Sequence, residues 1–91
     1  MVTAIILLKL DRERINETAE KLADDPAVSE VYSVSGSFDL VVVVRVKNND
    51  GLADLVTKRM AALPGIRQTE TMLAFRAYSR HDIEGMFSIG S

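Results

Sequence analysis

The sequence predicts an α+β fold, a ferredoxin-like βαββαβ sandwich in which two helices cover one face of a four-stranded antiparallel sheet. Two observations support this prediction. Strand-like and helix-like segments alternate in that order, and the two halves of the chain repeat each other. The 91 residues, 47% of them hydrophobic, suffice for one small core. We therefore expect one domain over residues 1–79, followed by a tail over residues 80–91 that could extend an interface.

Four segments have the composition of β-strands, because they are rich in β-branched and aliphatic residues and lack breakers. They cover residues 2–10, 28–34, 40–46 and 66–78. The second segment and part of the fourth alternate apolar and polar residues, as strands do when one face meets water. The first and third segments are apolar throughout. This difference predicts that the first and third strands are central in the sheet and that the other two are edges.

Two segments between the strands have the periodicity of amphipathic helices. Asp11 is a candidate N-cap of the first helix, and Pro26 marks its end. Its apolar stripe comprises Ile15, Ala19, Leu22 and Ala23. The second helix opens at Asn49, Asp50 and Gly51 and stops at Pro64 and Gly65. Its apolar face comprises Leu52, Leu55, Val56, Met60 and Leu63.

The internal repeat aligns residues 21–34 with residues 59–72 without a gap. Leu22 then matches Met60, and Pro26 matches Pro64. Any two helix-to-strand junctions that contain proline look somewhat alike. Because strands, helices and prolines match simultaneously, we interpret the pattern as a duplication of a βαβ unit.

The face of the sheet away from the helices is expected to be apolar at its centre. Ile5 and Leu7 point to one side of the first strand and Ala4, Ile6 and Leu8 to the other, and in the third strand Val41 and Val43 oppose Leu40, Val42, Val44 and Val46. Both sides of these two strands are therefore apolar. Such a patch usually marks an interface, and two sheets packed face to face would bury it. We therefore expect a homodimer formed through the sheets. Alternatively, the tail covers this face with its four large apolar residues, Ile83, Met86, Phe87 and Ile89.

Composition excludes several classes of function. The formal net charge is −2, with 11 basic and 13 acidic residues mixed along the chain, so no basic stripe favours direct binding of nucleic acid. There is no cysteine and only one histidine, His81, which excludes a metal site built from several such residues. The apolar N-terminal stretch is too short for a membrane span and lacks the basic start of a signal peptide. We expect a cytoplasmic protein.

No arrangement of residues suggests catalysis or a bound cofactor. Glycines stand singly at element boundaries, so there is no phosphate-binding loop. Arg80, His81 and Asp82 combine acid–base residue types, but a solvated turn accounts for them. The central strands offer only aliphatic side chains to a cavity. We therefore expect no catalytic residues, no cofactor and no metal.

The segment "SGSFD" at residues 35–39 interrupts this apolar region. Gly36 can take a positive φ and reverse the hairpin. A turn does not require Phe38 or Asp39, and a charge beside a run of valines is costly unless it is solvated or paired. Backbone NH groups of a Gly-Ser turn can bind a carboxylate and Asp39 can bind an ammonium group, which suits an amino acid. A plain turn with an exposed aspartate remains the alternative.

Thr69 and Thr71 form a second candidate pair. They lie two residues apart on the fourth strand and therefore share one face of the sheet. Two hydroxyls on one face can bind a carboxylate or an ammonium group. Threonine is also common on edge strands for structural reasons.

With these motifs the sequence resembles the effector-binding module of the Lrp/AsnC transcription factors, also called the RAM domain. The resemblance covers residues 1–79 and rests on the G-x-[FY]-D pattern in "VSGSFDLVVVV" and on P-G-[IV]-x-x-T-x-T in "LPGIRQTETMLAF". It implies dimers through the sheets, rings of dimers that are commonly octamers, and a small effector, usually an amino acid, bound between dimers. It also implies a ligand site at Ser35, Gly36, Phe38 and Asp39, joined by Thr69 and Thr71.

Regulators of this family carry a helix-turn-helix domain before the module, whereas here Met1 leads directly into the first strand. The resemblance therefore implies a stand-alone form that acts on transcription through a partner, for example a helix-turn-helix relative, without binding DNA. Two alternatives remain open. One is an enzyme of the dimeric α+β barrel type, a small monooxygenase or isomerase, and the other is an assembly module without a ligand.

Overall fold

The computed structural model describes residues 1–78 and 80, and its elements follow the predicted order. The strands are β1 (Val2–Leu10), β2 (Val28–Ser33), β3 (Leu40–Val46) and β4 (Ile66–Leu73). The helical elements are the 3₁₀ turn η1 (Arg12–Arg14), the helices α1 (Ile15–Ala23) and α2 (Asn49–Asp54), and the π-helical segment η2 (Leu55–Met60), which continues α2.

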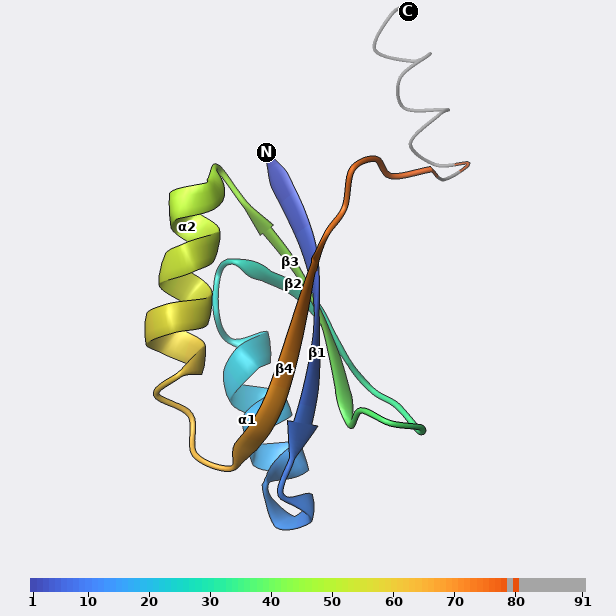
Figure 1. Ribbon diagram of the computed structural model, residues 1–91, viewed down its shortest axis with the longest axis vertical. Coiled ribbons are helices and arrows are strands. Elements are labelled where there is room, and N and C mark those ends of the chain that lie inside the picture. Colours follow the sequence, from blue (N-terminus) through green and yellow to red (C-terminus); the bar gives the residue numbers. More distant parts are fainter. Residues whose placement is uncertain (79, 81–91) are drawn as a thin grey trace, which may run out of the picture.

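The strands form one antiparallel sheet in the order β2-β3-β1-β4. Figure 1 shows the helices on one face of this sheet and the hairpin between β2 and β3 extending away from them. The ferredoxin-like fold is thus confirmed, with β1 and β3 central and β2 and β4 at the edges, as their apolar patterns predict.

The core lies between the sheet and the helices. Alternate side chains of the two central strands point into it, and the register pairs Ile6 with Val42 and Leu8 with Leu40. All four of these side chains are inaccessible to solvent. Burial of each such aliphatic side chain stabilises the fold by about 1.5–3 kcal/mol. With few aromatic residues in the chain, the core is aliphatic.

The opposite face of the sheet is apolar at its centre, as predicted. Ile5, Leu7, Val41 and Val43 are half-buried there, and the register pairs them across β1 and β3. Two edge residues extend this outer face, Tyr32 of β2 beside Val41 and Met72 of β4 beside Ile5. Both are exposed to solvent. No helix of the described residues covers this face (Figure 1).

The buried stripe of the first helix differs from the predicted one at a single residue. Leu22 is buried, and Ile15 and Ala19 pack against the core, but Ala23 is exposed. Thr18, which the prediction omitted, is buried, with 2% of its surface accessible. Thr18 lies four residues before Leu22 and so shares its face. Counting only apolar residues therefore shifted the predicted stripe.

The start of the first helix also differs from prediction. The chain first makes the 3₁₀ turn η1, and the carboxylate of Asp11 makes no capping hydrogen bond. It accepts a hydrogen bond from Arg67 Nε on β4 instead. An ion pair distant in sequence thus replaces the local cap. Asn48, by contrast, caps α2, because its Oδ1 accepts from the Gly51 amide at 2.9 Å.

The second helical segment packs as predicted. Leu55 and Met60 are buried, and Leu52, Val56 and Leu63 pack against the same core. The helix widens into π geometry at Leu55. π turns are uncommon and occur frequently beside functional sites.

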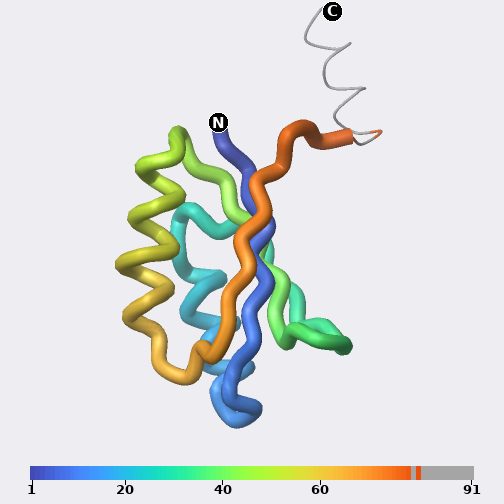
Figure 2. The backbone as a smooth tube through the Cα atoms, in the orientation of Figure 1, coloured from blue at the N-terminus to red at the C-terminus, as the bar shows by residue number. Residues whose placement is uncertain are grey.

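The fourth strand is shorter than predicted, since β4 ends at Leu73 and not at residue 78. Leu73 pairs with Ala4, and the Ala74 amide bonds to the Thr3 carbonyl. Among the described residues β4 pairs with β1 alone, and β1 begins at Val2, so residues after 75 have no strand partner. Residues 74–78 leave the sheet, as the orange end of the trace shows in Figure 2.

The two helix-to-strand junctions have equivalent acceptors but different donors in their backbone hydrogen bonds. Ala27 and Gly65 occupy equivalent positions after the two prolines, and each carbonyl accepts one hydrogen bond of 2.9 Å. Arg45 donates to Ala27 and Asp11 donates to Gly65. The donors are not equivalent, because the alignment that matches residue 21 with residue 59 matches Arg45 with Leu7 and not with Asp11. The predicted tail at residues 80–91 lies outside the described residues, apart from Arg80.

Candidate functional site

The loop between β2 and β3 forms one end of the sheet and contains four of the predicted ligand-binding residues. Gly36 has a φ of 116°, which a residue with a side chain rarely adopts, so the expectation of a positive φ is confirmed. Ser35 and Gly36 are exposed, whereas Phe38 and Asp39 are half-buried. The loop thus presents exposed backbone above a more protected base.

Asp39 fixes the base of this loop to β1. Its amide donates to the Leu8 carbonyl at 2.8 Å, and its own carbonyl accepts from the Val34 amide at 3.0 Å. Its carboxylate Oδ2 accepts from the Leu10 amide at 2.8 Å. Regular pairing between β1 and β3 stops at Leu8. The side chain therefore continues the ladder by one hydrogen bond where β3 no longer follows β1.

Sequence reasoning missed this role of Asp39. The partner lies 29 residues away, and the Leu10 amide is available because the pairing between β1 and β3 stops at Leu8. No local pattern signals such a bond. The hydrogen bond from Leu10 uses Oδ2 of the carboxylate. The other oxygen, Oδ1, accepts no hydrogen bond from residues 1–78 or 80. Asp39 can thus both hold the loop and present an acceptor.

Thr69 and Thr71 share the face of β4 that carries the helices. Thr69 lies opposite Leu8 and Thr71 opposite Ile6, whose side chains are both in the core. Because β4 is an edge strand, both threonines are exposed to solvent. Thr69 also lines a cavity of about 210 Å³ between η2 and β4.

One chain does not bring the loop and the threonines into one pocket. Leu8 has Leu40 on one side and Thr69 on the other, so both candidate groups lie at the same end of the sheet. They are separated by β1, that is by two strand spacings of about 4.8 Å each. The loop belongs to the β3 side and the threonines to the β4 side. Within one chain the two candidate groups therefore lie on opposite sides of β1.

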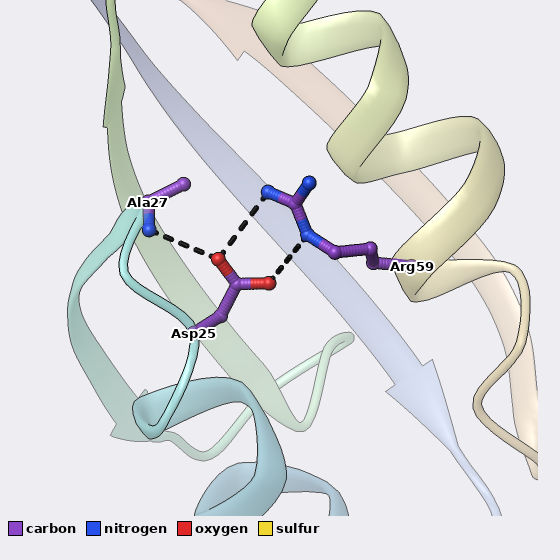
Figure 3. Close-up of polar contacts among 3 residues, drawn as sticks. All are labelled: Asp25, Ala27 and Arg59. Carbon is purple, nitrogen blue, oxygen red and sulfur yellow. Dashed lines mark hydrogen bonds and ion pairs between the residues drawn. The ribbon is translucent and has the colours of Figure 1, made fainter.

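A wide cleft of about 460 Å³ lies at the other end of β3, between α2 and the loop that follows α1. An ion pair between Asp25 and Arg59 spans it (Figure 3). Arg59 Nε donates to Oδ2 at 2.6 Å, and Asp25 Oδ1 accepts from the Ala27 amide at 2.9 Å. This pair joins the two halves of the repeat. The sequence analysis overlooked it because its members are 34 residues apart.

The pair changes the ionisation of Asp25, whose side chain is only 12% exposed. Burial raises the pKa of this carboxyl. The hydrogen bonds from Arg59 and from the Ala27 amide, together with the charge of Arg59, act in the opposite direction. Their combined effect holds the pKa of Asp25 below its ordinary value of 3.8.

The described part of the chain contains no cluster of three His, Asp or Glu residues that could hold a metal ion. None of its helices is long and apolar enough to cross a membrane.

Comparison with known proteins places this geometry in a family. Residues 3–83 match the family model of the Lrp/AsnC ligand binding domain. The HTH-type transcriptional regulator FL11 of Pyrococcus horikoshii is 33% identical over 75 residues, which are 82% of this chain and 49% of that protein. The chain thus spans about half the length of the curated relatives it matches.

Solved structures show the same fold. The structure of TTHA0845 from Thermus thermophilus superposes with a TM-score of 0.82 and 46% identity, covering 88% of this chain and all of that one. A transcriptional regulator of Neisseria meningitidis in complex with L-Met superposes with a TM-score of 0.77, over 87% of this chain and 53% of that one. At 12% identity the second likeness concerns the fold alone.

Replacement of Asp39 by alanine is expected to destabilise the protein by about 1–3 kcal/mol, because the Leu10 amide loses its acceptor at a half-buried position. Asp39→Asn is expected to cost less, since the amide oxygen can still accept. Urea unfolding of the two variants measures the difference. Equal losses in both variants would contradict this role of the carboxylate oxygen.

The Asp25–Arg59 pair is expected to make stability depend on pH. Since the pKa of Asp25 is lowered in the folded state, its contribution is present above the unfolded value and is lost as pH falls through the folded value. Arg59→Met should therefore cost about 1 kcal/mol at pH 7 and progressively less below pH 4.

Lys58→Met is the matched control for this experiment, because Lys58 pairs with Asp54 in a fully solvated setting. We expect it to change stability little at any pH. Free energies of unfolding from denaturant titrations between pH 3 and pH 7 test both variants. A constant difference between Arg59→Met and the wild type across this range would refute the assignment.

Proposed function

Because the chain belongs to the Lrp/AsnC ligand-binding domain family, we propose that it is a regulatory module that binds a small effector, an amino acid. The observation that carries this proposal is the match to a ligand-binding family over residues 3–83, with Asp39 held in the loop where the family motif lies. The relatives named as HTH-type transcriptional regulators support a role in regulating transcription. The regulator solved with L-Met supports an amino acid as the kind of effector.

In the proposed site, the loop at residues 35–39 and the two threonines bind opposite charges of the effector. Asp39 Oδ1 accepts from the ammonium group, and the exposed amides around Ser35 and Gly36 donate to the carboxylate. Thr69 and Thr71 belong to a second chain. The position of the loop and the threonines on opposite sides of β1 supports this division.

The proposed assembly is a dimer through the outer faces of the sheets, and rings of such dimers, for example octamers, complete the sites. The half-buried Ile5, Leu7, Val41 and Val43 support it, because packing two sheets face to face removes this apolar patch from water. The hairpin loops then extend from each dimer toward the next.

The proposed partner is a helix-turn-helix relative that supplies the contacts to DNA. A formal net charge of −2 supports this indirect role, because it offers little attraction to phosphates. In this proposal the protein works inside the cell and reports the effector to that partner, and it catalyses no reaction.

Amino-acid binding is expected to raise the melting temperature, because a ligand at a hundred times its dissociation constant stabilises the native state by about 2.7 kcal/mol. A thermal-shift screen with the twenty amino acids identifies the effector. Asp39→Asn should weaken binding at least about tenfold, since an amide replaces the charge that meets the ammonium group. Asp24→Asn, at an exposed position outside the loop, is the control.

If no amino acid raises the melting temperature of the assembled protein, the module has a purely structural role. If Asp39→Asn binds the effector as tightly as the wild type, the loop is not the site.

Leu7→Glu is expected to break the proposed dimer, because it places a charge at the centre of the apolar outer face. Ala53→Glu is the matched control, on an exposed helix position away from that face. Size-exclusion chromatography with light scattering measures the mass of each. A wild-type species of 10.0 kDa at micromolar concentration would exclude the dimer.

A further inference from the structure

Charged side chains surround the apolar centre of the outer face of the sheet. That centre consists of two cross-strand pairs of aliphatic residues, Ile5 with Val43 and Leu7 with Val41. On the edge strands, Glu70 of β4 pairs with Leu7, and Glu30 of β2 pairs with Val43. The two carboxylates therefore flank the apolar centre on opposite edges of the sheet.

Two basic side chains stand at the ends of the same face. Lys9 comes two residues after Leu7 on β1, and Arg45 comes two residues after Val43 on β3, so alternation puts both on the outer face. Because β1 and β3 are antiparallel, Lys9 lies beyond one end of the apolar centre and Arg45 beyond the other. The face thus has cations at its two ends and carboxylates along its two edges.

These four charged groups make no ion pair with any residue of the described part of the chain. All four residues are exposed. Lys9 and Glu70 are diagonal neighbours on adjacent strands, a separation that long side chains can span, yet they are not joined. Glu30 accepts a hydrogen bond from the hydroxyl of Tyr32, which is neutral. The charges are therefore available to a second chain.

The positions of the charges distinguish between the two ways in which sheets pack face to face, with their strands nearly aligned or nearly perpendicular. In the aligned arrangement, a two-fold axis lays the ends of one sheet over ends of the other, and edges over edges. Cations then face cations, and carboxylates face carboxylates. In the perpendicular arrangement each end lies over an edge, so every cation faces a carboxylate.

We propose that two copies of the chain pack through these faces with their strands nearly perpendicular, and that cations of each copy pair with carboxylates of the other, Lys9 with Glu70 and Arg45 with Glu30. This inference rests on the dimer of the proposed function. It goes beyond that dimer by naming its orientation and the residues that select the partner. Since the axis is two-fold, each of the two pairs occurs twice.

Two corner residues decide between the two senses of the perpendicular arrangement, which differ in the carboxylate that meets Lys9. Tyr32 and Met72 lie at diagonally opposite corners of the face. Both are exposed in one chain. The sense that pairs Lys9 with Glu70 brings Tyr32 of one copy against Met72 of the other, a favourable contact between an aromatic ring and a thioether. In the opposite sense each corner residue meets its own counterpart.

The charges act mainly on the choice of partner. Exposed ion pairs are individually weak, whereas like charges held together in an interface are unfavourable. The apolar centre thus supplies the attraction between two sheets, and the surrounding charges select the orientation. A related chain with a cation in place of Glu70 is therefore disfavoured as a partner, even where its centre is equally apolar.

Charge-reversed variants test the pairing through the composition of mixed dimers. A homodimer of Lys9→Glu, or of Glu70→Lys, contains two repulsive pairs, whereas a dimer with one chain of each variant restores both. If each homodimer is about tenfold weaker, about nine-tenths of the dimers in an equimolar mixture contain both variants, against about half for random association. Native mass spectrometry with one variant labelled with ¹⁵N measures this fraction. Contacts within a chain are the same in both kinds of dimer and do not produce the preference.

Two further mixtures are matched controls, and both should associate at random. A preference for mixed dimers between Lys9→Glu and Glu30→Lys would show the opposite perpendicular sense. A preference between Lys9→Glu and the wild type would show that Lys9 faces Lys9, as in the aligned arrangement. Either result overturns the inference, and so does random association of Lys9→Glu with Glu70→Lys. Urea unfolding checks that each variant folds.

The mass of the wild type separates this inference from the proposed function. Light scattering that shows a wild-type dimer, together with random association of all the variants, overturns the orientation and keeps the proposed assembly. A wild-type monomer overturns both.

Discussion

The antiparallel register between β1 and β3 is the constraint on which the rest of the structure depends. A slip by one residue would exchange the core face and the outer face of both strands. Because both strands are apolar on both faces, hydrophobic patterning alone specifies this register weakly. Asp39 adds what the pattern lacks, since its amide bonds to the Leu8 carbonyl and its carboxylate bonds to the Leu10 amide. These bonds fit one register only, and they place the hairpin loop at a fixed point beside β1.

In the proposed site, the same bonds connect stability with recognition. A loop that binds a ligand loses less entropy when its base is already ordered. Asp39 orders that base with one oxygen, and Gly36, at a φ of 116°, turns the backbone above it. In the proposed site, Asp39 therefore both holds the loop and binds the ligand. This also explains why a charge is tolerated beside the valines of β3, since it is held by a backbone donor at a half-buried position.

Patterns within one segment predicted most of the fold, and contacts between segments account for what they missed. The apolar runs identified β1 and β3 as central because burial on both faces leaves a local trace. The end of β4 depends on where β1 begins, and no property of residues 74–78 reveals it. Asp11 does not cap the first helix because its carboxylate accepts a hydrogen bond from Arg67 on β4, a contact that no local pattern indicates. The same holds for the candidate site. The sequence motifs predicted its residues, whereas their relative positions depend on the strand order, which no single motif contains.

The proposed site between chains agrees with two features of the fold. The sheet buries one face against helices, and its other face, with Leu7 and Val43 at the centre, has the composition of a second core. The loop lies on the β3 side of β1, whereas Thr69 and the cavity lie on the β4 side. In the proposed dimer, burying the outer face against a second chain adds a hydrophobic contribution to stability. The proposed ring of dimers then brings the loop of one dimer to the β4 edge of another. In such an arrangement the ligand contacts two dimers at once, so it binds more tightly to the assembled state and shifts the population toward it. A small effector can then control assembly without a large conformational change in any single chain.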